Sequence, residues 1–339
     1  MTASSGPTPT RVTLADVAAA AGVATSTASD ALNQRGRMAE STRERVHQKA
    51  RELGYLPNPS ARGLRVGRSR LIGVALRMYL DAPDMYPRDL YYSQLITAGS
   101  TTAVDRGYAV ALLPAHDLDI AGELPLAALI ITDSDVESET VEHAHGLGIP
   151  VITDLREGDD RAAAVVDIDY PYAIALANDH LTENGARRIG LVAYEPRDTS
   201  YAYNWEKHHA LWCAEASSDC IIRRAGSNDI KLLTQAVHEL VEAGCDGIVL
   251  IPTGAGPEAI EILAKMGQRV PDDVLVLAVD EDPSLAFVRP TLTTISLDPI
   301  RSATEGMDLV IDVIEGKIPA PTSFLIPPIL IPAESTVRR

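Results

Sequence analysis

The chain has 339 residues, two to three times the usual size of one domain, so we expect two or three domains. Its composition, 46% hydrophobic and 23% charged, is that of a globular protein, and the sequence contains no run of about 20 apolar residues that could cross a membrane. Residues 1–10 lack the apolar segment of a secretory signal. We therefore expect a cytoplasmic protein with no membrane partner.

The net charge of −17 conceals a basic N-terminal segment. Residues 1–70 contain eleven Lys and Arg against five Asp and Glu, a net charge of +6, which leaves −23 for residues 71–339. Phosphates attract the first segment and repel the second, so this division favours a nucleic-acid-binding head on an acidic body.

Few residues suggest metal or catalytic chemistry. The three cysteines, an odd number without a CxxC pair, argue against a disulfide framework and against a cysteine-built zinc site: Cys213, Cys220 and Cys245. The histidine pairs 143/145 and 208/209 have no nearby partners at zinc spacing. No Gly-x-Ser-x-Gly elbow is present. We expect no catalytic residues, no metal and no cofactor.

Local signals predict three short helices near the N-terminus. Thr13 and Asp16 form a capping-box pattern, Gly22 follows the first helix, and a second helix is expected over 25–32. Ser41 with Glu44 suggests a second capping box, opening a helix that stops at Gly54. A small core is predicted from Leu14, Val17, Val23, Ala28, Leu32, Val46 and Leu53.

These segments resemble the DNA-binding head of the lactose-repressor/galactose-repressor family of bacterial transcription regulators. The resemblance rests on residues 12–23 (VTLADVAAAAGV), 29–33 (SDALN), 42–46 (TRERV) and 53–58 (LGYLPN). It continues through the body in 71–75 (LIGVA), 106–108 (RGY), 148–150 (GIP), 188–190 (RIG), 270–273 (VPDD) and 292–295 (LTTI). It covers roughly residues 11 to 335.

The resemblance implies an N-terminal three-helix helix-turn-helix head and an α/β, two-lobed, periplasmic-binding-protein-like core with parallel sheets. The head would span residues 11–57 and a hinge residues 58–70. The N-terminal lobe of the effector-binding core would comprise 71–168 and 299–324, and the C-terminal lobe 169–298 and 325–335.

The second helix of a helix-turn-helix enters the major groove with its N-terminal residues against base edges. Thr25, Ser26 and Asp30 are therefore predicted to contact bases, with Ser29 and Asn33 nearby. Relatives often have Ser as the N-cap where this chain has Ala24, so we expect Thr25 to cap instead.

Asp30 stands where relatives often carry a donor such as Arg, and a carboxylate can accept from a cytosine or adenine amino group. The alternative is a solvated Asp30, or one paired with Arg35 or Arg37. Both arginines are predicted to contact the DNA backbone.

In the family, the hinge forms a short helix on operator DNA, and paired hinges insert a leucine into the minor groove. The resemblance assigns this wedge to Leu64 and the close approach of two hinges to Ala61, with Arg62 and Arg65 on phosphates. Gly63 disfavours a free helix, so ordering should depend on DNA. A plain linker role for Leu64 is the alternative.

From residue 71 onward, short β-like runs alternate with helical patterns, which indicates parallel sheets. Strands are predicted at 71–76, 110–113, 128–131, 151–153, 189–193, 247–251 and 274–279, with helices at 90–106, 172–183, 229–243 and 256–266. Crossovers between lobes are expected near residues 169, 299 and 324. Ligands of such folds bind at the carboxyl ends of strands.

The resemblance places effector-binding residues at those ends. Asp280 matches an aspartate that binds effector hydroxyls in relatives, although it could instead cap a turn at Pro283. The other candidates are Asp154, Tyr79, Tyr91, Lys207 and Thr253. Tyr79, Tyr86 and Tyr91 could stack on a ring or simply pack a loop. Because Pro252-Thr253 and Lys207 replace residues usual in relatives, the sugar-binding set is incomplete and the effector stays open.

The predicted function is that of a sequence-specific DNA-binding transcriptional regulator, a repressor that acts as a homodimer on a pseudo-palindromic double-stranded operator. A small-molecule effector, a sugar or related metabolite, would bind between the lobes. The alternatives are a solute-binding or sensor protein without specific DNA function, and an enzyme that uses the cleft.

Overall fold

The computed structural model describes residues 13–32, 38–53, 69–76, 90–115, 117–133, 139–154, 161–195, 199–226 and 229–338. The chain divides into two compact units, 1–69 and 70–339.

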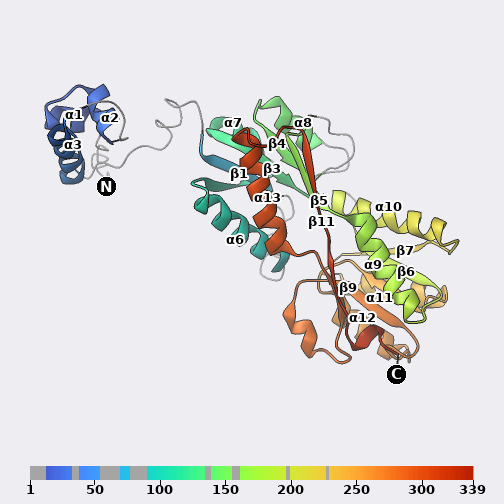
Figure 1. The fold of residues 1–339 in the computed structure, drawn as a ribbon. Helices are drawn as coiled ribbons and strands as arrows, with labels where there is room; N and C mark the ends of the chain where they lie inside the picture. The colour runs from blue at the N-terminus through green and yellow to red at the C-terminus, as the bar shows by residue number, and fades with distance from the viewer. Residues whose placement is uncertain are drawn as a thin grey trace, which may run out of the picture. The chain divides into compact units, whose positions relative to one another are not determined.

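The described residues of the first unit form three helices: α1 (Leu14–Ala21), α2 (Thr25–Leu32) and α3 (Glu40–Glu52) (Figure 1). The predicted capping box of α1 is confirmed, since the Thr13 side chain accepts from the Asp16 amide and Asp16 accepts from the Thr13 amide. Gly22 ends α1 with φ 64°, a left-handed conformation that glycine adopts without steric cost. This turn leads the chain directly into α2.

Two predicted caps are wrong. Thr25 is the first residue of α2, because the Ala28 amide already donates to the Ala24 carbonyl, which leaves Ala24 at the cap. The proposed box of Ser41 and Glu44 does not open α3. That helix begins earlier, since the amides of Thr42 and Arg43 donate to the carbonyl of Ala39. Backbone hydrogen bonds therefore set both starts without a side-chain cap.

Small side chains build the core of the head. Val17, Ala18, Ala21, Ala28, Ala31, Val46 and Ala50 are buried, and Leu14, Val23, Leu32 and Met38 pack against them. Leu53 was predicted to lie in this core but is 39% exposed, because α3 ends before it.

The second unit contains two six-stranded sheets. The first has the order β11-β5-β4-β3-β1-β2, and every adjacent pair of its strands is parallel. Its strands are β1 (Leu71–Leu76), β2 (Ala109–Pro114), β3 (Leu126–Thr132), β4 (Val151–Thr153), β5 (Ala164–Ile168) and β11 (Thr322–Ile326).

The second sheet has the order β12-β10-β9-β8-β6-β7. It comprises β6 (Ile189–Tyr194), β7 (Ile221–Ala225), β8 (Gly247–Leu250), β9 (Leu275–Val279), β10 (Thr293–Ser296) and β12 (Ile329–Ile331). Four of its pairings are parallel and only the β10–β12 pair is antiparallel. The predicted parallel sheets are thus confirmed, with one antiparallel edge strand.

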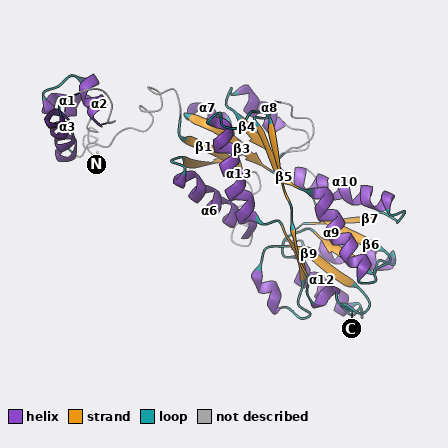
Figure 2. Ribbon diagram, in the orientation of Figure 1, coloured by secondary structure: helices purple, strands orange, loops and turns teal. Residues whose placement is uncertain are grey.

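Helices cover both faces of each sheet (Figures 1 and 2). On the first sheet, α6 (Leu90–Asp105) and α13 (Pro299–Ile314) pack on one face, and α7 (Asp119–Glu123) and α8 (Glu139–Gly146) on the other. On the second, α9 (Tyr170–Glu183) and α10 (Ser200–Glu215) oppose α11 (Ile230–Glu242) and α12 (Ala255–Lys265). Buried strands with helices on both faces explain the nearly continuous apolar runs of the sequence.

The chain passes between the sheets after β5, between β10 and α13, and between β11 and β12. Five strands and several helices of the described residues had no assignment from the sequence, among them β5, β7, β10, α10 and α13. None of the described helices combines the length and apolar character that a bilayer crossing requires.

Candidate functional site

The outward face of α2 presents the side chains predicted to contact bases. Thr25, Ser26 and Asp30 are exposed, and Ser29 is half-buried. Ala28 and Ala31, on the other face of the helix, are buried in the head core. The helical period therefore turns a set of short polar side chains toward solvent, as a recognition helix requires.

The remaining predicted DNA contacts and one predicted effector contact lie outside the described residues: Asn33, Arg35, Arg37, Ala61, Arg62, Leu64, Arg65 and Tyr79. Tyr86 also lies there.

A cavity of about 780 Å³ lies in the second unit, at the carboxyl ends of strands from both sheets. Its lining includes Asp133 and Asp154, which follow β3 and β4, and Thr253 and Asp280, which follow β8 and β9. The size is that of a site for a small metabolite, and the location is where open parallel sheets bind ligands. The cavity thus collects four of the six predicted effector residues: Tyr91, Asp154, Thr253 and Asp280.

Asp280 and its neighbour Glu281 differ in how their carboxylates are held. Asp280 accepts two backbone hydrogen bonds, from the amides of Gly254 (2.9 Å) and Asp282 (3.0 Å). Glu281 accepts one from the Ser296 hydroxyl (2.7 Å) and one from the Leu297 amide (2.6 Å). Burial raises the pKa of both carboxyls above their ordinary values. The turn at Pro283, which Asp280 was alternatively expected to cap, is capped by Asp282.

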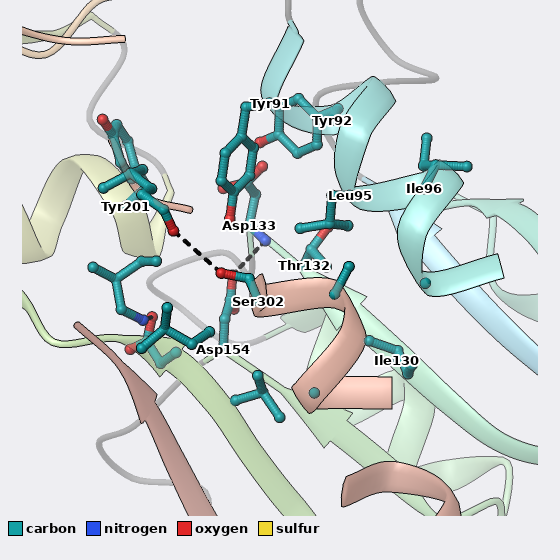
Figure 3. A pocket seen from close by; sticks show the side chains of 18 of the residues that line it. Tyr91, Tyr92, Leu95, Ile96, Ile130, Thr132, Asp133, Asp154, Tyr201 and Ser302 are labelled. Atoms are coloured by element: carbon teal, nitrogen blue, oxygen red, sulfur yellow. Dashed lines mark hydrogen bonds between the residues drawn. The ribbon is translucent and has the colours of Figure 1, made fainter. Parts of the chain in front are cut away.

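Asp154 and Tyr91 face the same part of the cavity (Figure 3). Asp154 accepts from the backbone amide of Asp133 at 2.5 Å, which joins the ends of β3 and β4. Tyr91, at the start of α6, has a pKa well above its ordinary value because it is buried and faces the charges of Asp133 and Asp154. Its hydroxyl is therefore a neutral donor and acceptor.

Besides Tyr92 on α6, sequence reasoning missed three aromatic residues of the cavity, Tyr170, Tyr194 and Tyr201. The rings of Tyr194 and Tyr201 lie edge to face at 5.8 Å, and Tyr170 lies 6.4 Å from Tyr201. The Tyr194 hydroxyl also accepts from the Thr253 amide (2.9 Å), which fixes the loop after β8. These rings come from α9, β6 and α10, so no local sequence signal unites them.

Lys207 does not lie among the residues that line the cavity. The buried positions of α10 include Trp205, Glu206 and His209, and Lys207 projects from another side of the helix. Its ammonium nitrogen lies 5.9 Å from the centre of the Tyr203 ring. The structure therefore separates Lys207 from the other predicted effector residues.

Acidic groups dominate the charge of the cavity. Its lining includes seven carboxylates, and the described part of the lining contains no Lys, Arg or His: Asp133, Asp154, Asp167, Glu195, Asp229, Asp280 and Glu281. This acidic lining favours a ligand that donates hydrogen bonds and carries no negative charge.

Two family models match the chain. Residues 13–58 match the model described as bacterial regulatory proteins, lacI family. Residues 178–336 match the model described as a periplasmic binding protein-like domain. The first match covers the head helices and the second most of the second sheet with its helices.

Curated relatives match over nearly the whole length. The HTH-type transcriptional repressor CytR of Escherichia coli (strain K12) is 29% identical over 331 residues, covering 91% of each chain. The HTH-type transcriptional repressor PurR of Actinobacillus pleuropneumoniae serotype 3 is 24% identical over 315 residues, covering 88% of this chain and 90% of the relative.

Solved structures share the fold. The lac repressor dimer bound to operator and the anti-inducer ONPF superposes with a TM-score of 0.80 at 22% identity, covering 97% of this chain and 100% of that one. The complex of the transcriptional regulator CelR with cellobiose gives 0.69 at 21% identity, covering 96% and 100%. The chain therefore has a helix-turn-helix head that matches the lacI family of bacterial regulatory proteins, and a body of two sheets around a ligand-sized cavity that is similar in fold to the lac repressor.

Proposed function

We propose that this protein is a transcriptional repressor that binds a specific operator through α2 and releases or tightens it when a small molecule occupies the cavity. The observation that carries the proposal is the exposure of Thr25, Ser26 and Asp30 on α2, in the same chain as a cavity lined from two sheets. The characterised relatives named above are repressors, which supports a regulatory role and not an enzymatic one. Operator binding would place the protein in the cytoplasm.

In this proposal the four domain segments predicted from the sequence act as head, hinge and two lobes. Two copies of the chain present two heads to the half-sites of a pseudo-palindrome, as a two-fold symmetric protein requires. In this proposal Leu64 wedges between base steps in the minor groove and Ala61 lets the two hinges approach closely, while Arg62 and Arg65 contact phosphates. Asn33, Arg35 and Arg37 extend the contacts of the head.

The effector is proposed to be a neutral or cationic molecule rich in hydroxyl or amino groups. Ionised carboxylates only accept hydrogen bonds, so a ligand held by Asp154, Asp280 and Glu281 must supply the donors. A phosphate or carboxylate on the ligand would be repelled by the seven acidic side chains. Tyr91 and Tyr201 add ring faces against which a sugar or base can pack.

Selection of a duplex from a random pool by the full-length protein tests the DNA function. We expect a pseudo-palindromic motif, and an affinity that falls by roughly 10³- to 10⁵-fold between 50 and 200 mM salt if six to ten phosphates are contacted. Leu64→Ala should weaken binding to the selected duplex. Binding that is indifferent to sequence, and unchanged in Leu64→Ala, would favour the solute-binding alternative.

A matched pair of substitutions tests whether α2 reads the operator. Asp30→Arg and Glu44→Arg make the same change of charge at exposed positions of the head, on α2 and α3. We expect Asp30→Arg to change the selected bases at one position of each half-site, since the side chain would become a donor. Glu44→Arg should leave the motif unchanged. An identical motif from both variants would remove Asp30 from the recognition surface.

Thermal denaturation with matched ligand pairs tests the effector class. Each sugar or nucleoside is compared with its phosphorylated form, and sugars also with their amino derivatives. A ligand at about 100 times its dissociation constant adds about 2.7 kcal/mol of stability. We expect stabilisation by a neutral or amino compound and none by its phosphate. A phosphorylated compound that stabilises more than its neutral parent would contradict the assignment, while leaving DNA binding intact.

A further inference from the structure

Three potential metal ligands meet at one end of α10, away from the cavity lining. His209 and Cys213 lie one helical turn apart on α10, and Cys220 immediately precedes β7. Their ligand atoms all lie within 4.8 Å of one another. This cluster is not evident from the sequence, because the two cysteines are seven positions apart and not in a CxxC pair, and because the chain must reverse direction to bring them together.

The separation of the two ligand atoms on α10 fits a tetrahedral ion. The Cys213 sulfur lies 3.6 Å from His209 Nε2. An ion at about 2.3 Å from sulfur and about 2.05 Å from nitrogen, at the tetrahedral angle, holds these atoms about 3.6 Å apart. The helix therefore already presents one edge of the tetrahedron, and Cys220 supplies a third corner within reach.

A buried amide orients the histidine ring. Asn178 on α9 is fully buried and its Nδ2 lies 3.2 Å from His209 Nδ1, so Nε2 is the nitrogen that faces the sulfur. Metal at Nε2 requires the ring proton on Nδ1 and an acceptor for it. A half-turn of the Asn178 amide provides that acceptor, Oδ1, which has no hydrogen-bond partner within the described part of the chain. Within the described residues, the half-turn therefore breaks one side-chain hydrogen bond of this amide, the one from Nδ2 to the His209 ring.

The turn after α10 fixes Cys220. Ser217 has φ 53°, a left-handed conformation that is uncommon outside glycine, and the Ser218 amide donates to the Cys213 carbonyl at 2.9 Å. Asp219 forms an ion pair with Arg188. The third ligand is thus held over the helix end by the backbone and by a neighbouring side chain, as a preformed site requires.

We propose that His209, Cys213 and Cys220 form a binding site for a thiophilic divalent ion, Zn²⁺, with the fourth position open to water. Soft thiolates with one imidazole select Zn²⁺ over Mg²⁺ or Ca²⁺. Binding converts two thiols to thiolates and releases two protons to solvent, so that two negative charges offset the ion and the site carries no net charge. Cys220 is exposed, which gives the ion a path from solvent.

The site would join α10 to the strand that follows it. The N-terminal part of α10 contributes Tyr201 to the cavity wall, so an ion at the other end of the helix would stiffen an element on which the effector packs. The expected readout is an increase in melting temperature on addition of Zn²⁺.

Cobalt substitution in the reduced, full-length protein tests the proposal. Tetrahedral Co²⁺ with thiolate ligands gives sulfur-to-metal charge-transfer absorption and intense d–d bands, which carboxylate-bound Co²⁺ does not. We expect one equivalent of Co²⁺ to give both features, one equivalent of Zn²⁺ to bleach them, and two protons to be released per ion. Cys220→Ser removes an exposed ligand without disturbing the core and should abolish all three signals. Cys245→Ala, which removes the cysteine outside the cluster, should retain them.

Three results would overturn the proposal. The first is cobalt absorption without charge transfer, which would identify weak binding by surface carboxylates. The second is charge transfer that persists in Cys220→Ser. The third is a reduced protein without affinity for Zn²⁺ whose Cys213 and Cys220 form a disulfide in air, which would make the pair a redox element and not a metal site.

Discussion

The adjacent carboxylates Asp280 and Glu281 should respond in opposite ways to loss of charge. Asp280→Asn replaces two accepting oxygens with one, so either the Gly254 or the Asp282 amide then faces an NH₂ group. Glu281→Gln keeps both of its hydrogen bonds, because its oxygen can accept from the Leu297 amide and its NH₂ can donate to the Ser296 hydroxyl. Both changes remove a carboxylate whose charged form burial disfavours.

The magnitudes follow from these contacts. A buried amide left without an acceptor costs about 1 to 3 kcal/mol, and the lower half of this range applies because Gly254 is exposed and Asp282 is half-buried. Relief of the buried charge offsets part of that cost. At roughly 2 to 4 °C per kcal/mol for a domain of this size, Asp280→Asn should melt below wild type, by less than roughly 8 °C. Glu281→Gln should melt at or above wild type.

Calorimetry of the ligand-free, full-length proteins measures both effects, and a ligand titration on the same samples adds the functional comparison. Asp280→Asn should also weaken any effector that raises the melting temperature of the wild type. Equal shifts in the two variants would refute the reasoning, because they would show that charge alone, and not the number of accepting oxygens, governs this end of β9. A more stable Asp280→Asn would refute it as well.

Two further predictions concern the head and the response to pH. Thr13→Ala removes one half of the capping box of α1 and should cost the head about 1 kcal/mol, which calorimetry would detect as a lower head transition beside an unchanged transition of the body. Because burial raises the pKa of Glu281, the folded state holds its proton more tightly than the unfolded state, so this contribution to stability is complete in acid and is lost as pH rises through the folded-state pKa. Glu281→Gln should therefore gain melting temperature over wild type near neutral pH and not in acid; a gain that is the same at every pH would contradict the assignment.

The helices of the head were predictable because their ends are set by contacts between residues close in sequence. The Thr13 box and the turn at Gly22 depend on residues three to nine positions apart, so sequence order and spatial order coincide there. The predicted caps at Thr25 and Ser41 failed because the backbone entered each helix earlier than the side-chain signal suggested.

The cavity was predictable only where a residue directly follows a strand. Asp154, Thr253 and Asp280 could be placed at strand ends because parallel strands align their carboxyl ends. Tyr170 and Tyr201 could not, since their position depends on how α9 and α10 pack on the second sheet. For the same reason Lys207 was wrongly expected at the cavity, because tertiary packing decides which side of α10 faces it. The cluster at Cys213 and Cys220 was missed because it, too, depends on tertiary packing.

The order of strands along the chain has a consequence for synthesis. One edge strand of each sheet, β11 in the first and β12 in the second, comes from residues 322–331. Helix α13, which supplies part of the cavity wall, follows β10 in the sequence and is therefore also made late. The head helices need only the first 53 residues, whereas neither sheet is complete until almost the whole chain has left the ribosome. Contacts between residues so distant in sequence also form slowly. The head can therefore fold early, and the cavity that is proposed to control it is among the last parts of the protein to form.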